Sequence, residues 1–220
     1  MATPLAQTMT VLALDTASPS PSVSLLRGGT VSCETLSSDR RASEELLPAI
    51  GRLLERSGIS LANCDRIAVC SGPGSFTGLR IGLATAWGLS RGSGVEVEPV
   101  PTLEALAEAA RGCGAERVAA ALDAGRGEVV LAFYGLAGER AELLSPAQRL
   151  SRDEARTQSR GVALAALPDT LLEAPTVSLS DHLSTALARA VSRAPRPSGP
   201  LEAAAVYSRA SAAEEKRGAA

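Results

Sequence analysis

A chain of 220 residues with 45% apolar and 21% charged side chains has the composition of a globular protein that buries a core. No apolar run approaches the roughly 20 residues of a membrane span, so the sequence excludes a membrane protein. The net charge of −2 and the five aromatic side chains argue against a general attraction to nucleic acid and against a base-stacking surface.

Two residue types are almost absent. The only lysine is Lys216, which excludes a P-loop, because that loop needs Gly-Lys-Ser/Thr at the start of a helix. The only histidine is His182, so a zinc site would depend on cysteines. The cysteines form no C-x-x-C pair, and we interpret them as small buried hydrophobic residues in a reducing, cytosolic protein without a metal. They are Cys33, Cys64, Cys70 and Cys113.

In the first half of the chain, short apolar or β-branched runs alternate with helical patterns. Strands are expected at residues 11–14, 22–26, 30–35, 67–70 and 95–100. A first helix is predicted by apolar residues at helical spacing, with Ser43 as N-cap and Gly58 as its stop. Its apolar stripe consists of Leu46, Leu47, Ile50, Leu53 and Leu54. Further helices are expected at 77–90 and 102–111, which gives the order βββαβα and then βα.

The second half repeats this order. Strands are expected at 117–122, 128–134, 141–144, 161–167 and 176–179, and helices at 151–157 and 181–193. Ala-Leu-Asp closes the first strand of each half, at Asp15 and at Asp123. The sequence therefore predicts an α/β fold of two lobes, residues 1–112 and 113–194, followed at 195–220 by a linker and tail that packs back or frays.

A glycine-rich block, Ser-Gly-Pro-Gly-Ser-Phe-Thr-Gly-Leu-Arg at 71–80, joins a predicted buried strand to a predicted helix. Such a turn aims backbone N–H groups beyond the strand end, where an anion or a partner's carboxylate would bind. A turn whose glycines only supply unusual backbone angles explains the block equally well. Its glycine spacing differs from the dinucleotide fingerprint, and Pro73 removes a donor where a pyrophosphate would approach.

The same block resembles a nucleophile elbow, with Ser75, Asp123 and His182 in the order of a hydrolase triad. Pro73 stands where the elbow needs a glycine. Asp15 and Asp123 also suggest a pair of carboxylates that face each other across a cleft and hold Mg²⁺ with a nucleotide. The simpler alternative is that each aspartate caps the turn after its strand.

On the helix after the block, Gly78, Gly82 and Ala86 are four residues apart and form one smooth face, flanked by Ile81 and Trp87. Such a face lets another backbone approach closely. Packing on the chain's own sheet and contact with another subunit are both consistent with it.

Four segments resemble the TsaB family of bacterial tRNA threonylcarbamoyladenosine biosynthesis proteins: VLALDTA at 11–17, SGPGSFTGLRIG at 71–82, PTLEAL at 101–106 and DAGRGEV at 123–129. The likeness runs in the same order from residue 11 to 134. The resemblance implies an actin-like ATPase (ribonuclease H-like) fold and a subunit without catalysis of its own. It implies pairing with the paralogous enzyme TsaD and the ATPase TsaE to modify the adenosine beside the anticodon of tRNAs that read ANN codons.

The resemblance also implies that tRNA is met only through the complex, that ATP and Mg²⁺ act at the level of the complex, and that the chain homodimerises when alone. The partner interface is expected on the first two helices, at Leu46, Leu47, Ile50, Leu53, Leu54, Phe76, Gly78, Ile81, Gly82 and Ala86. Anion or nucleotide contacts are expected at Asp15, Thr16, Gly72, Gly74, Ser75 and Asp123.

The chain departs from the family pattern at three positions. Ala42 stands where many members have histidine, Gly125 replaces an arginine and Val130 replaces a tyrosine. The alternative to a scaffold is an enzyme, either an actin-like-fold kinase or a hydrolase that acts through Ser75, Asp15 or Asp123.

Overall fold

The structure is a computed structural model that describes residues 9–36, 42–167, 170, 179 and 182–196. The first lobe is built on a five-stranded mixed sheet in the order β3-β2-β1-β4-β5. Strand β1 pairs antiparallel with β2 and parallel with β4. The strands are β1 (Val11–Asp15), β2 (Ser22–Arg27), β3 (Thr30–Thr35), β4 (Arg66–Cys70) and β5 (Glu96–Val100).

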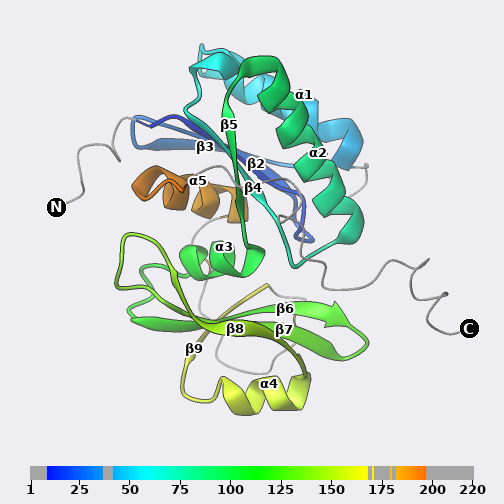
Figure 1. The fold of residues 1–220 in the computed structure, drawn as a ribbon, viewed down its shortest axis with the longest axis vertical. Coiled ribbons are helices and arrows are strands. Elements are labelled where there is room, and N and C mark those ends of the chain that lie inside the picture. Colours follow the sequence, from blue (N-terminus) through cyan, green and yellow to red (C-terminus); the bar gives the residue numbers. More distant parts are fainter. Residues whose placement is uncertain (1–8, 37–41, 168–169, 171–178, 180–181, 197–220) are drawn as a thin grey trace, which may run out of the picture.

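Helices cover both faces of this sheet (Figure 1). Helices α1 (Ala42–Arg56) and α2 (Phe76–Ser93) lie on one face, and α3 (Thr102–Ala109) and α5 (Leu183–Arg193) on the other. The alternation of side chains along β1 supplies both cores, because Leu12 and Leu14 point to α1 and α2 while Val11 and Ala13 point to α3 and α5. A short 3-10 helix, η2 (Leu61–Asn63), precedes β4.

The second lobe repeats the strand order of the first. Its sheet runs β8-β7-β6-β9, with β6 (Arg117–Gly125), β7 (Glu128–Gly135), β8 (Glu142–Ser151) and β9 (Ala163–Ala166). Helix α4 (Arg152–Gln158) covers one face. The other face packs on α3, all of whose residues are buried between the two sheets. The predicted α/β architecture of two lobes with mixed sheets is therefore confirmed.

The structure differs from several sequence expectations. Helix α1 begins at Ala42, so Ser43 lies in its first turn and is not the N-cap. Strand β8 extends to Ser151, far beyond the expected end at 144, because it follows β7 along most of its length. The expected strand at 176–179 lies, except for residue 179, outside the described residues.

The last helix also changes the expected division into lobes. Helix α5 follows the second lobe in the chain but packs against β1, β2 and β4 of the first. Buried hydroxyl groups allow this close approach: Ser184 Oγ lies 2.8 Å from both Ser22 Oγ and Ser24 Oγ. The boundary at 194 expected for the second lobe therefore assigns α5 to the wrong sheet.

The cysteines lie in different environments. Cys64 and Cys70 are buried, as expected, but Cys33 is half-buried and Cys113 is exposed.

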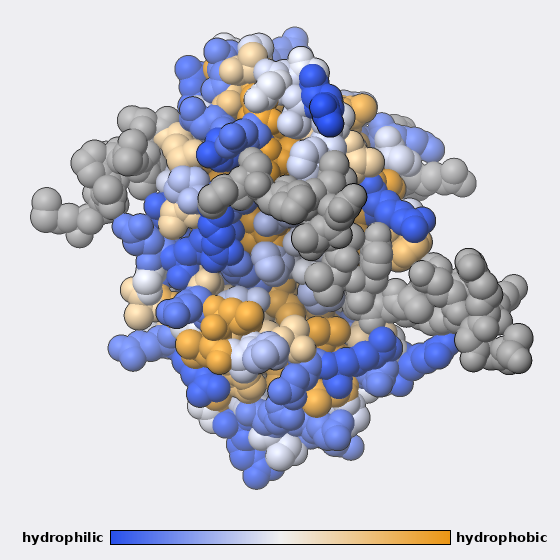
Figure 2. Space-filling view, in the orientation of Figure 1, coloured by the Kyte–Doolittle hydropathy of each residue, from blue (hydrophilic) through white to orange (hydrophobic). Residues whose placement is uncertain are grey.

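In the described ranges no helix is long and apolar enough to cross a membrane, and no cluster of three or more His, Cys, Asp or Glu side chains is arranged to hold a metal ion. Figure 2 shows apolar side chains gathered on the second lobe, where Figure 1 places β7 and β8.

Candidate functional site

The glycine-rich loop between β4 and α2 is tied to the start of α3. Gly72 has a φ of 107°, which favours glycine, and its peptide bond to Pro73 is cis. Gly72 N donates to Thr102 Oγ1 at 3.2 Å, and Thr102 N donates to the Gly72 carbonyl oxygen at 2.8 Å. The loop is thus fixed to the rest of the first lobe before α2 begins.

The next part of the loop interlocks with the loop that follows β1. Ser75 N donates to the Ala17 carbonyl oxygen at 3.0 Å, and Thr16 Oγ1 donates to the Gly78 carbonyl oxygen at 2.6 Å. A Cβ on Gly78 would lie 1.8 Å from the Thr16 carbonyl oxygen, and one on Gly74 would lie 2.8 Å from that of Ala17. Both glycines are therefore required for close backbone approach within the chain.

These contacts use the N–H groups that the sequence suggests for an anion. Gly72 N and Ser75 N donate to Thr102 and Ala17, and Gly78 N donates to Ser75 Oγ at 3.2 Å, where Ser75 caps α2. An anion bound here would have to displace these internal partners. The geometry thus favours the structural interpretation of the block over an anion site.

Asp15 and Asp123 each cap their own loop. Asp15 is buried and accepts hydrogen bonds from Ala17 N at 2.9 Å and from Ser18 N at 3.1 Å. Burial raises the pKa of Asp15, although hydrogen bonds from Ser18 and Ala17 oppose this shift. Asp123 is partly exposed, accepts from Gly125 N at 3.1 Å and pairs with Arg152 at 3.1 Å. No hydrogen bond or ion pair in the described structure joins the two aspartates.

The triad order Ser75, Asp123, His182 is likewise not assembled. Ser75 caps α2, Asp123 pairs with Arg152, and His182 is the N-cap residue of α5. Among the described side chains, no hydrogen bond or ion pair connects any two of the three. Nothing in this geometry activates Ser75 as a nucleophile.

The smooth face of α2 packs within the chain. A Cβ on Gly82 would lie 2.4 Å from Thr16 Oγ1, and Ala86 is fully buried. With Gly78 these residues seat α2 on β1 and β4, so the expectation that this face contacts another subunit is corrected. The same correction applies to Leu46, Ile50 and Leu53, which are buried in the core under α1.

Four of the expected interface residues remain at the outer surface of α1 and α2. Leu47 is 54% exposed. Leu54, Phe76 and Ile81 are half-buried, and the Arg80 guanidinium lies 3.9 Å from the centre of the Phe76 ring. We call these four residues, which lie on the neighbouring helices α1 and α2, the α1–α2 face; two of them, Leu54 and Ile81, also pack against the core.

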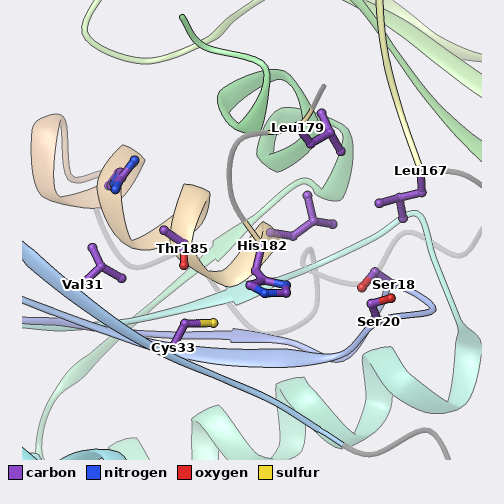
Figure 3. A pocket seen from close by; sticks show the side chains of 10 residues that line it. Ser18, Ser20, Val31, Cys33, Leu167, Leu179, His182 and Thr185 are labelled. Carbon is purple, nitrogen blue, oxygen red and sulfur yellow. The ribbon is translucent and has the colours of Figure 1, made fainter. Parts of the chain in front are cut away.

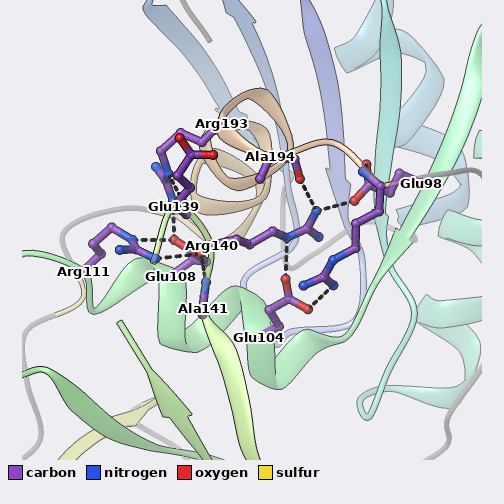
Figure 4. A network of polar contacts seen from close by, with 10 residues as sticks. Glu98, Glu104, Glu108, Arg111, Glu139, Arg140, Ala141, Arg193 and Ala194 are labelled. Carbon is purple, nitrogen blue, oxygen red and sulfur yellow. Dashed lines mark hydrogen bonds and ion pairs between the residues drawn. The ribbon is translucent and has the colours of Figure 1, made fainter. Parts of the chain in front are cut away.

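An ion-pair cluster between the lobes is not foreseen by the sequence analysis (Figure 4). Arg140, from the loop between β7 and β8, is buried and donates from Nε to Glu104 at 2.5 Å and from Nη1 to Glu98. Glu108, one turn after Glu104 on α3, pairs with Arg111 at 2.8 Å and also with Arg193. Two buried glutamates four residues apart on an Ala- and Leu-rich helix are the only sequence signal.

Burial alone would raise the pKa of Glu108. The hydrogen bond from Arg111 and the charge of Arg193 outweigh this effect, so the pKa of Glu108 is lowered. The cluster thus keeps Glu108 ionised where the two lobes meet.

A cavity of about 510 Å³ lies between the start of α5, β3 and the loop after β1 (Figure 3). Figure 3 shows His182 beside the cavity, with Ser18 and Ser20 on one side and Cys33 on another. Its other described lining residues are Val31, Leu167, Leu179, Leu183, Thr185 and Arg189.

Comparison with known proteins shows which family this chain belongs to. The family model described as "TsaD: tRNA N6-adenosine threonylcarbamoyltransferase" matches residues 30–194, well over half of the chain. Among solved structures, YeaZ from Pseudomonas aeruginosa is 38% identical, with a TM-score of 0.61 over 66% of this chain and 68% of that one.

A second structure, of an uncharacterised protein described as similar to YeaZ from the same organism, is 30% identical. It has a TM-score of 0.70 over 92% of this chain and 100% of that one.

Curated relatives carry the name tRNA threonylcarbamoyladenosine biosynthesis protein TsaB. The Escherichia coli protein is 42% identical over 57% of this chain and 55% of its own length, and the Haemophilus influenzae protein is 41% identical over 56% and 52%. The chain thus spans about half the length of the curated relatives it matches. The chain belongs to the TsaD family of threonylcarbamoyltransferase-like proteins and, within it, to the TsaB type.

Proposed function

We propose that this protein is a scaffold subunit without catalysis of its own, which pairs with a TsaD paralogue for threonylcarbamoylation of tRNA. The modified group is the adenosine beside the anticodon of tRNAs that read ANN codons. TsaE supplies ATPase activity, tRNA meets the chain only through the complex, and the complex works in the cytoplasm.

The observation that carries the proposal is the interlock of Thr16 with Gly78. In an α/β sheet a nucleotide would bind outside the carboxyl ends of the strands, where the loop after β1 lies. Here that loop is fixed to α2, and its buried Asp15 caps its own turn. Thr16 and Asp15, which would contact a nucleotide in a kinase, instead hold α2 and the loop after β1 in place. This use of the two side chains favours a scaffold over a kinase.

The α1–α2 face supports the choice of docking surface. Helix α1 buries Leu46 and Leu53 in the core but exposes Leu47. The exposed apolar surface is therefore available to a partner. The partner we propose for this face is the N-terminal lobe of TsaD. In the absence of TsaD, a second copy of this chain occupies the same face.

Reconstitution tests the proposal directly. TsaD, TsaE, ATP, a supply of threonylcarbamoyl-adenylate and tRNA are incubated with and without this chain, and threonylcarbamoyladenosine is measured by mass spectrometry. We expect product only when the chain is present. Equal product without it, from partners shown to be active with their own TsaB protein, would contradict the proposal.

The kinase or hydrolase alternative has a separate test. ATP at 100 times its dissociation constant would stabilise a nucleotide-binding chain by about 2.7 kcal/mol. We expect no shift in the melting temperature of the isolated chain with ATP and Mg²⁺. A saturable shift would return the enzyme hypothesis.

A further inference from the structure

The cavity beside α5 has two facing walls, one from the helix and one from strand β3. His182, Thr185 and Arg189 are three and four residues apart, so they lie along one face of α5 over about 10 Å, starting at its N-cap. Val31 and Cys33 are alternate residues of β3 and lie opposite (Figure 3). The side chains of His182 and Arg189 are exposed, so they mark the mouth of the cavity.

The floor of the cavity consists of its buried lining residues, Ser18, Leu183 and Thr185. The hydroxyl groups of the floor are already paired within the chain. Ser18 Oγ donates to Asp15 at 2.5 Å, and Thr185 Oγ1 lies 2.9 Å from Ser24 Oγ. A ligand therefore meets satisfied hydroxyl groups and an apolar side chain at the floor, which favours an apolar body in this part of the cavity.

The charges around the cavity favour an anion at the mouth. Arg189 carries a positive charge, and its planar guanidinium has five N–H donors that match a carboxylate. The described lining residues include no Asp or Glu. Asp15, which is fully buried, lies next to the floor through its hydrogen bond with Ser18. A second negative group is therefore disfavoured at the floor and favoured near Arg189.

We propose that this cavity binds a small monocarboxylate with an apolar body, with the carboxylate on Arg189 and the body between α5 and β3. The volume of about 510 Å³ lies within the roughly 300–1,000 Å³ of small-molecule sites. A nucleoside triphosphate fits poorly, because the described lining offers one guanidinium for several phosphate charges.

This inference does not rest on the proposed function. Helix α5 lies on one face of the first sheet, and α1 and α2 lie on the other. The cavity and the α1–α2 face are thus separate, and ligand binding can fail while pairing with TsaD is retained.

Titration of the full chain with octanoate, followed by amide NMR, tests the proposal. We expect saturable shifts of the amide signals of Val31 and Thr185, while the signal of Leu47 stays unchanged. Octanamide and octylamine carry the same body with a neutral and a positive head group. Each should bind at least about 5-fold more weakly than octanoate, because neither offers a carboxylate to Arg189.

A pair of arginine variants tests the position of the carboxylate. Arg189→Gln should weaken octanoate binding by at least about 5-fold. Arg91→Gln is the matched control, since Arg91 is an exposed arginine in the last turn of α2 and should leave the dissociation constant within about twofold of wild type. The comparison of head groups uses the wild-type chain, so it stands even where a variant folds poorly.

Several results would overturn the proposal. Octanoate that produces no saturable shift at Val31 and Thr185 would show that the cavity takes no such ligand. Equal affinity for octanamide or octylamine, or equal affinity of Arg189→Gln and Arg91→Gln for octanoate, would remove the carboxylate from Arg189. Displacement of octanoate by ATP with Mg²⁺ at a lower concentration than octanoate itself requires would assign the cavity to a nucleotide.

Discussion

Gly78 and Thr16 hold two loops of the first lobe against each other. Thr16 Oγ1 donates to the Gly78 carbonyl oxygen at 2.6 Å, and a Cβ on Gly78 would lie 1.8 Å from the Thr16 carbonyl oxygen. The start of α2 is thus positioned by the loop after β1, which lies 62 residues earlier in the chain. The contact therefore also fixes the position of the α2 residues that belong to the α1–α2 face.

Gly78→Ala should therefore destabilise the fold by at least about 3 kcal/mol, because backbone on both sides of the contact leaves no room for relaxation. Gly88 is the matched control, since it is exposed on the same helix and a Cβ added there would have nothing within 4 Å. Gly88→Ala should stabilise the protein by about 0.5–1 kcal/mol through helix propensity. Urea denaturation measures both, and equal stability of the two variants would contradict the interlock.

Gly82→Leu separates packing within the chain from contact between subunits. The sequence alone allows a variant that loses pairing while the folded monomer survives. The Cβ position 2.4 Å from Thr16 Oγ1 instead predicts a lower melting temperature of the isolated chain. A wild-type melting temperature together with lost pairing would restore the intersubunit interpretation.

Arg140→Ala should destabilise the protein by about 3 kcal/mol, because it removes the buried guanidinium that Glu98 and Glu104 share and leaves them with the half-exposed Arg196. Arg149→Ala provides the control, since its pair with Glu128 is exposed on both sides and should be worth less than about 1 kcal/mol. Similar losses in the two variants would show that the interlobe cluster does not fix the lobes.

The pKa of Asp15 is shifted upwards, whereas the pKa of a carboxylate in an ion pair is usually shifted downwards. Its pKa is raised above 3.8 by burial, so the unfolded chain ionises first and this group's contribution to stability falls as the pH rises through the folded pKa. Asp15→Asn keeps an oxygen for Ala17 N and Ser18 N and should be at least as stable as wild type at pH 7. Asp15→Ala should lose about 1–3 kcal/mol. Stabilisation of wild type, but not of Asp15→Asn, by Mg²⁺ would instead indicate an ion site.

Glu108 should make the protein sensitive to acid. Its pKa lies below the usual 4.5, so its stabilising contribution is complete above that pH and is lost as the pH falls through the lower, folded value. The free energy of unfolding should therefore decline less steeply below pH 4.5 in Glu108→Gln than in wild type. Parallel pH profiles would contradict the assignment of this shift to Glu108.

The periodicity of side chains is sufficient to predict the first sheet. All five of its strands fall where alternating or apolar runs lie, because local pattern and final burial agree there. Strand β8 is longer than the sequence predicts because its residues are almost all exposed and carry no apolar alternation. The packing of α5 on the first sheet rests on contacts with β2 some 160 residues away, which no local pattern reports.

The candidate site is predictable in position but not in orientation. The apolar stripe of α1 identifies a helix with much hydrophobic surface, yet period alone cannot separate Leu46, which fills the core, from Leu47, which faces solvent. The glycines of α2 indicate close approach without naming the neighbour. That neighbour is Thr16, rather than a nucleotide or a second subunit.

The most direct test of the account is the affinity of this chain for TsaD, measured by isothermal titration calorimetry with Leu47→Asp. Leu47 lies on the α1–α2 face and is exposed, so the variant should fold normally. We expect the affinity to fall by at least about 30-fold, as for loss of a buried apolar anchor worth about 2 kcal/mol. Leu144→Asp, which replaces a similarly exposed leucine on the second lobe, should bind like wild type. Unchanged affinity of Leu47→Asp would contradict the assignment of the α1–α2 face as the docking surface.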